Sequence, residues 1–137
     1  MTSVASQAGW VPDEDDQPPR PHFSNVEEFV TTFLSPHIQR NLGGTMTWCS
    51  KWWKHTEAVS RLTSLWMAWE HQRLQGATGM SVWWLHHADP HMNVLLSRDA
   101  GPFARCKPDE HRQGKDLPCT PAPPNMWMSS AFSDTGS

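Results

Sequence analysis

The stretch TWCSKWWKHTEAVSRLTSLWMAWEHQRLQ, residues 47–75, contains no glycine and no proline and carries the strongest periodic pattern of the chain. At 100° per residue its apolar side chains fall on one stripe. That stripe comprises Trp48, Trp52, His55, Val59, Leu62, Trp66 and Trp69. A narrower second stripe holds Cys49, Trp53, Met67 and His71. A helix that is apolar on two sides is usually covered on both, so the pattern predicts a long central helix.

Shorter helical patterns flank this stretch. Ser24 and Glu27 have the spacing of a capping box before an apolar face that reaches Leu34, and Pro36 then predicts a stop or kink. A short helical turn is expected over Ile38–Leu42. After the glycines at 76 and 79, Ser81 is expected to cap a helix to about His87, and Asp89-Pro90 to begin another through Leu96. No period-2 run is long enough for a sheet, so we expect a mainly α fold of three to five helices.

The chain divides into a central domain and two polar tails. Residues 1–22 are acidic and proline-rich, and residues 107–137 contain five prolines among small polar residues, so both are predicted to be disordered. The domain is then 23–106, about 80 residues, and it holds seven of the nine tryptophans. Large indole rings are expected to build a core that a domain of this size otherwise lacks.

Composition narrows the function classes. The net charge is −3, but residues 23–106 hold seven Lys and Arg against six Asp and Glu, without the strongly basic balance typical of a nucleic-acid binder. No G-x-S-x-G, Walker or G-x-G-x-x-G motif occurs, so an enzyme is the less favoured reading. There is no apolar run that could span a membrane, and the odd number of cysteines fits free thiols, so we expect a cytoplasmic protein without a membrane partner.

Histidines and cysteines are the residue types most suggestive of a site. A zinc or other transition-metal centre could draw on Cys49, His55, His71, His87, His91 and Cys106. None of the familiar zinc spacings is clean, and Pro90 between His87 and His91 is expected to break the face that they would share. The alternative is no metal or cofactor at all, with His55 a hydrogen-bonded core residue and the other histidines capping helices or facing water.

Two surface hypotheses remain open beside the metal site. The first is an interaction module that binds a protein partner or itself through exposed indoles at Trp53, Trp83 and Trp84, because two adjacent tryptophans on a helix point about 100° apart. Met126-Trp127-Met128 in the tail is typical of a short peptide anchor, or is inert. The second is a weak nucleic-acid-associated role through Lys51, Lys54, Arg61 and Arg73. The alternative to this role is that Trp53 packs on the second stripe while the lysines stay in solvent.

The spacing of the tryptophans also resembles that of an actinobacterial family of unknown function. The resemblance rests on Trp48-Cys49, Trp52-Trp53-x-His55-x-Glu57-Ala58, Trp83-Trp84-x-x-His87-Ala88-Asp89-Pro90-His91 and Gly101-Pro102-Phe103-x-x-Cys106. It covers 23–106 and brings no assigned activity. It implies an accessory role on plasmids, phages or integrative elements. Residues 97–100 are less turn-like than the family's usual form, and the tail after Cys106 lies outside the resemblance.

Overall fold

The computed structural model describes residues 19–128, so most of the predicted N-terminal tail 1–22 and the last part of the predicted tail 107–137 lie outside the described residues. Its first helical stretch is α1 (Val26–Phe29), η3 (Val30–Leu34) and α2 (Ser35–His37), followed by η4 (Trp52–Lys54) and α3 (Thr56–Gln72). Next come η5 (Gly76–Thr78), α4 (Gly79–Val82), η6 (Trp83–Ala88) and α5 (Asp89–Leu95), and η7 (Met126–Met128) lies near the C-terminal end. Residues 19–128 contain isolated β-bridges and no strand, so the predicted mainly helical fold is confirmed.

The central helix is shorter than residues 47–75. Helix α3 begins at Thr56, because His55 has extended backbone angles (φ −107°, ψ 115°), and only a single 3-10 turn at Trp52–Lys54 precedes it. Trp48 and Trp52 therefore do not share a helical stripe with Trp66 and Trp69. The prediction of one continuous helix was wrong because tertiary contacts of residues 46–50 with residues 96–108 bend this segment away from helical geometry.

The first helix begins one residue later than the capping-box pattern predicted. Asn25, not Ser24, is the N-cap: its side-chain oxygen accepts a hydrogen bond from the Glu28 backbone N–H at 2.8 Å. The Glu28 carboxylate in turn accepts from the Ser24 backbone N–H. A capping motif is thus present, but it is made by Asn25 and Glu28, each one residue after the predicted Ser24 and Glu27.

Two prolines that were expected to interrupt helices lie inside continuous helical backbone. Pro36 follows the π-helical residues 30–34, and Pro90 follows the π-helical residues 83–88. A proline ring in a regular α-helix collides with the carbonyl four residues earlier, and a widened π turn before it moves that carbonyl away. Consequently Asp89 is helical (φ −59°, ψ −50°) and is not the N-cap that was predicted. The predicted turn at Ile38–Leu42 is absent, because the first helical stretch ends at His37.

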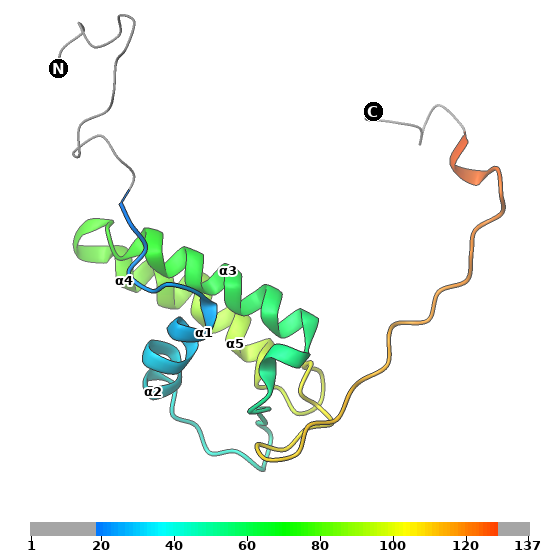
Figure 1. Cartoon of the computed structure of the whole chain (residues 1–137), viewed down its shortest axis with the longest axis horizontal. Coiled ribbons are helices and arrows are strands. Elements are labelled where there is room, and N and C mark those ends of the chain that lie inside the picture. The colour runs from blue at the N-terminus through cyan, green and yellow to red at the C-terminus, as the bar shows by residue number, and fades with distance from the viewer. Residues whose placement is uncertain (1–18, 129–137) are drawn as a thin grey trace, which may run out of the picture.

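The core lies between α3 and the helical run 79–95, which returns alongside it, with the first helix across one side (Figure 1). Trp83 is fully buried, and its indole N–H donates to the Leu65 carbonyl at 3.0 Å. At the turn between the two long helical runs, a Cβ on Gly79 would overlap the Gln72 carbonyl oxygen, so only glycine allows this close approach. Trp52, Trp69 and Trp83 are buried and Trp48, Trp66 and Trp84 half-buried, as a tryptophan-rich core requires.

Within residues 19–128, helices long and apolar enough to cross a bilayer do not occur.

Candidate metal centre

Four side chains from three separate segments converge beside the N-terminal end of α3. Cys49 comes from the loop before the 3-10 turn, His55 is the residue from which α3 starts, and Cys106 and His111 follow the last core residue, Phe103. Their four ligand atoms, two Sγ and two ring nitrogens, all lie within 4.8 Å of one another. Cys49, His55 and Cys106 are buried, and His111 is half-buried at the edge.

Two of three distances between the ligand atoms agree with those around one tetrahedral ion, and the third is slightly longer. Cys49 Sγ lies 3.4 Å from His111 Nδ1, and Cys106 Sγ lies 3.4 Å from His55 Nε2 and 4.0 Å from His111 Nδ1. Around a tetrahedral zinc with Zn–S near 2.3 Å and Zn–N near 2.0 Å, neighbouring ligand atoms are about 3.3 to 3.8 Å apart. Two sulfurs with two imidazole nitrogens form the donor set of structural zinc sites.

Backbone hydrogen bonds fix the segments that carry these ligands. The Thr47 hydroxyl donates to the Cys106 carbonyl at 2.9 Å, and the Ser50 backbone N–H donates to the Pro108 carbonyl at 3.3 Å. Lys107 and Glu110 pair with each other across a tight turn, which brings His111 back toward Cys106. The ordered contacts of the domain therefore continue beyond Cys106, where the sequence analysis placed its boundary, to Arg112.

The Cys106 sulfur has a further backbone partner. The Arg112 backbone N–H donates to Cys106 Sγ at 3.3 Å, and the Arg112 carbonyl oxygen, also 3.3 Å from this sulfur, accepts from the Cys106 thiol. Backbone N–H groups of this kind orient metal-bound sulfur ligands. These contacts fix the position of the Cys106 sulfur beside His55 and His111.

The electrostatics of the cluster favour uncharged side chains when no cation is present. Burial raises the pKa of the Cys49 thiol, and Cys106 beside it adds to the rise, while a backbone hydrogen bond at Lys51 opposes it. Burial, with a smaller contribution from His111, lowers the pKa of His55. Neutral imidazole is the form that ligates a metal, whereas thiol protons must leave, so metal binding here would release protons.

Three of the six predicted metal ligands belong to this cluster: Cys49, His55 and Cys106. The other three lie elsewhere. His71 is exposed near the end of α3, and His87 and His91 lie on the helical run 83–95, where His91 Nδ1 is 3.1 Å from an Arg61 guanidinium nitrogen. Because the helix is continuous through Pro90, these two histidines do share a face. Burial, Arg61 and His87 together lower the pKa of His91.

The fourth residue of the cluster, His111, was missed because it lies in the segment predicted to be disordered. A signal was present in the spacing: Cys49-x5-His55 is followed by Cys106-x4-His111. Two similar Cys–His pairs in one short chain are a better indicator of a metal centre than any of the histidines considered alone.

The three tryptophans of the predicted interaction patch are placed differently from one another. Trp53 is 55 % exposed and Trp84 half-buried, whereas Trp83 is fully buried in the core. Trp53 lines a groove beside the 3-10 turn, and Trp84 lines a different cavity, against α5. A patch that needs Trp83 at the surface is therefore inconsistent with its burial, and Trp53 is the most exposed indole of the three.

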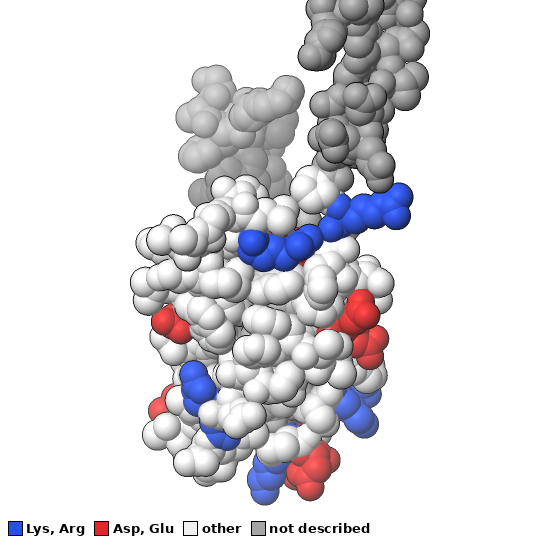
Figure 2. Space-filling view, turned by 90° about the vertical axis from the view of Figure 1, so that its left-hand side faces the viewer, with Lys and Arg blue, Asp and Glu red and all other residues white. Residues whose placement is uncertain are grey.

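The four predicted nucleic-acid contacts are partly occupied by acidic partners. Arg61 pairs with Glu57 at 2.9 Å and Arg73 with Glu70 at 3.0 Å. Lys51 is exposed, and the Lys54 ammonium lies 5.7 Å from the centre of the Trp53 ring. The face drawn in Figure 2 is mostly uncharged, with basic and acidic groups in separate small spots. No continuous basic surface is seen on that face.

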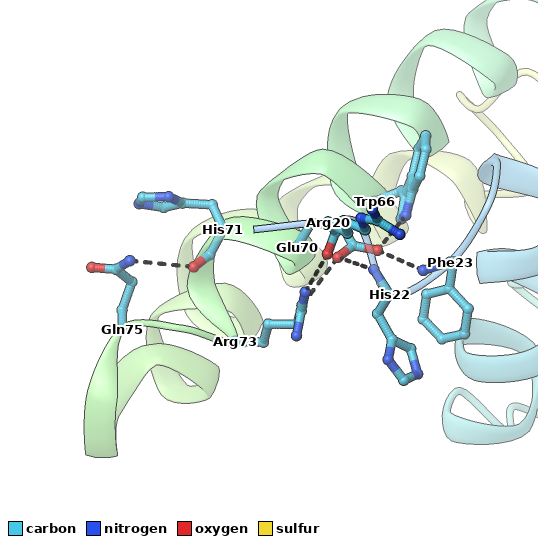
Figure 3. A network of polar contacts seen from close by, with 8 residues as sticks. All are labelled: Arg20, His22, Phe23, Trp66, Glu70, His71, Arg73 and Gln75. Atoms are coloured by element: carbon cyan, nitrogen blue, oxygen red, sulfur yellow. Dashed lines mark hydrogen bonds and ion pairs between the residues drawn. The ribbon is translucent and has the colours of Figure 1, made fainter. Parts of the chain in front are cut away.

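A second polar cluster lies at the opposite end of α3 (Figure 3). The Glu70 carboxylate accepts hydrogen bonds from the backbone N–H groups of His22 (2.7 Å) and Phe23 (2.9 Å). It also accepts from the Trp66 indole at 2.9 Å and from Arg73 at 3.0 Å. Burial alone would raise the pKa of Glu70, but these donors together outweigh it and lower the pKa. This cluster joins the N-terminal segment to the domain.

Comparison with known proteins gives a family but no activity. The model of a family described as a domain of unknown function, DUF4913, matches residues 23–125. Neither the curated proteins nor the solved structures contain a match to the chain. The matched range includes all four residues of the cluster.

Proposed function

The chain belongs to the DUF4913 family of domains of unknown function, and we propose that it is a non-catalytic, zinc-binding interaction module. Its Cys49–His55–Cys106–His111 centre would stabilise the domain rather than react. The observation that carries the proposal is the convergence of two thiols and two imidazoles within 4.8 Å.

A structural role follows from the number of ligands. Catalytic zinc sites keep one position open for water or substrate, whereas structural sites use four protein ligands. Here the chain supplies all four, and three of them are buried. An ion bound there would be shielded from substrates by its own ligands, which supports a binding module over an enzyme.

The choice of zinc follows from the donor types. Calcium and magnesium prefer oxygen ligands, and the cluster offers none. Thiolates with imidazoles suit zinc, and a reducing compartment such as the cytoplasm keeps such thiols available. The accessory role on a mobile element that the family resemblance implies is compatible with a small binding module of this kind.

Metal content and coordination test the proposal directly. Protein made without a histidine tag is expected to contain one zinc per chain by elemental analysis. Its cobalt-substituted form should show the strong visible absorption of a tetrahedral site with thiolate-to-metal charge transfer. Cys106→Ser and His111→Ala should each lower zinc affinity at least 10-fold, the range seen when a metal's coordination is disturbed.

Two matched controls separate this result from nonspecific binding. Cys119→Ser removes an exposed cysteine outside the cluster, and His86→Ala removes an exposed histidine, so both should retain one zinc. Zinc at well below one equivalent in the wild-type protein, even after refolding with zinc, would refute the metal centre.

A further inference from the structure

Two short loops of the metal centre lie against each other at the N-terminal end of α3. Each runs between a cysteine and a histidine of the cluster: residues 50–54 in the first pair and residues 107–110 in the second. A backbone hydrogen bond of 3.3 Å from Ser50 to Pro108 joins them. We call them the metal loops. An ion held by all four ligands would fix both loops in one arrangement.

Both metal loops present exposed lysines. Lys51 and Lys54 belong to the first loop, where the Lys54 backbone N–H donates to the Lys51 carbonyl at 3.0 Å. Residues three apart in a 3-10 turn lie above one another, so these two side chains leave the same side of the turn. Lys107 belongs to the second loop. It precedes Pro108, and Lys51 follows Ser50, so these two lysines flank the hydrogen bond between the loops.

The three lysines are not neutralised by carboxylates. Among residues 19–128 the ion pairs are made by arginines, and one of them, Arg112, holds Glu110 of the second loop at 2.6 Å. Asp109 is then the one free acid of the metal loops, against three lysines. The two loops therefore have a net positive charge that is open to an anionic ligand, although the domain as a whole is nearly neutral.

An exposed indole lies beside these charges. Trp53 is 55 % exposed, and the Lys54 ammonium lies 5.7 Å from the centre of its ring. Single-stranded nucleic acids are bound by this combination, because unpaired bases stack on aromatic rings while cations meet the phosphates. In a duplex the base faces are already stacked on each other. An acidic peptide would use the lysines but not the ring.

We propose that the metal loops bind single-stranded nucleic acid, with one base stacked on Trp53 and phosphates against Lys51, Lys54 and Lys107. This names the partner of the proposed interaction module and rests on its zinc centre, which would hold the two loops together. The surface keeps the two lysines considered from the sequence and leaves out the two arginines, whose charges are paired with glutamates.

Fluorescence anisotropy of a labelled oligothymidine of about 12 nucleotides, with the full-length zinc-loaded protein, tests the proposal. We expect a dissociation constant of about 100 µM at physiological salt, the weak end of the range for non-specific binding. Each phosphate contact adds about −0.7 to the slope of log affinity against log salt, so three contacts predict a slope of about −2. A duplex of the same length should bind several-fold more weakly, and an oligouridine compares RNA with DNA.

Substitutions in the metal loops should change affinity in opposite directions. Trp53→Ala removes the stacking surface and should weaken binding at least 5-fold, whereas Trp53→Phe should recover most of the loss. Lys107→Gln should weaken binding and also reduce the salt slope by about 0.7, which a purely structural role would not change. Asp109→Asn should tighten binding about 2-fold. Lys115→Gln, an exposed lysine outside the loops, is the matched control and should change neither quantity.

Zinc content measured on the same samples separates failure of this surface from failure of the metal centre. A protein with one zinc per chain that binds neither oligonucleotide would overturn the nucleic-acid surface alone, and a protein without zinc would refute the centre beneath it. Circular dichroism establishes that each variant is folded. A Trp53→Ala protein that binds like the wild type, a duplex bound as tightly as the single strand, or complete competition by polyglutamate at equal charge would each overturn the proposal.

Discussion

Helix α3 is fastened to distant parts of the chain at both of its ends, and the two ends use different chemistry. At the C-terminal end one carboxylate, Glu70, accepts four N–H groups, two of them from the N-terminal segment. At the N-terminal end four soft ligand atoms face one another around His55. The first is complete with protein atoms alone. Under our proposal, a zinc ion holds the distant segments together at the N-terminal end of α3, as the N–H donors to Glu70 do at its C-terminal end.

Metal removal should have the largest effect of any change at either end. Structural zinc contributes about 10 to 16 kcal/mol of apparent folding free energy in zinc-finger peptides, and this domain has a hydrophobic core besides, so we expect a loss of several kcal/mol. Thermal unfolding by circular dichroism, with and without a strong chelator, measures it. Cys106→Ser should be insensitive to the chelator, and Cys119→Ser should behave like the wild type. A wild-type Tm that the chelator does not shift would remove the contrast between the two ends.

Glu70→Gln is expected to have the next largest effect. The amide keeps the size but replaces a charged acceptor of four hydrogen bonds and places an NH2 group against N–H donors, at a cost of about 2 to 3 kcal/mol. Glu57→Gln is the control, since its exposed pair with Arg61 should contribute less than about 0.5 kcal/mol. Urea unfolding compares them. Equal costs would mean that the Glu70 cluster does not fasten the N-terminal segment.

Two tryptophans on α3 offer a finer test of the same end. The Trp66 indole N–H donates to Glu70, whereas the buried Trp69 N–H has no hydrogen-bond partner among the described residues. Both changes to Phe lose indole area, but Trp66→Phe also takes a donor from the carboxylate, so it should cost roughly 1 kcal/mol more than Trp69→Phe. Urea midpoints at constant slope give the difference. The reverse order would contradict the hydrogen-bond assignment.

The pH dependence of the chelated protein should give the smallest effect. The folded-state pKa values of His55 and His91 are lowered, so below the ordinary value of 6.5 the unfolded chain binds more protons than the folded one. Stability is thus fully present above pH 6.5 and falls as the pH decreases from 7 toward 5. Urea unfolding across that range checks the sign, and His55→Gln should flatten the slope. A stability that rises toward pH 5 would show that burial does not depress these groups.

Much of the helical content could be predicted from the sequence, and the ends of the helices could not. The apolar periodicity of residues 56–72 is local information, and it placed Leu62 and Trp69 on the buried face. The bend at residues 46–55 depends on hydrogen bonds to segments some fifty residues later, such as the one from Thr47 to Leu96. Single-sequence periodicity carries no information on those contacts.

Three of the four residues of the Cys/His cluster were among the candidate ligands named from the sequence, and the fourth was not. Cys49, His55 and Cys106 were considered because of their residue types, and His111 was excluded by the proline-rich composition around it. Composition averages over a segment, whereas the turn between Lys107 and Glu110 is a local structure that the average conceals. Similarly, at least one of the adjacent Trp83 and Trp84 was expected to be exposed. The structure buries Trp83, whose indole N–H donates to the Leu65 carbonyl, and leaves Trp84 half-buried.

The order of the ligands along the chain has a consequence for synthesis on the ribosome. His55 and Cys106 are separated by 51 residues, and His111 emerges last. By then the helical hairpin between them has been translated and can have folded, which removes most of the entropy of closing so long a loop. Zinc capture would accordingly follow the folding of the helices, and a nascent polypeptide that stops short of residue 111 would display folded helices with only three of the four donors.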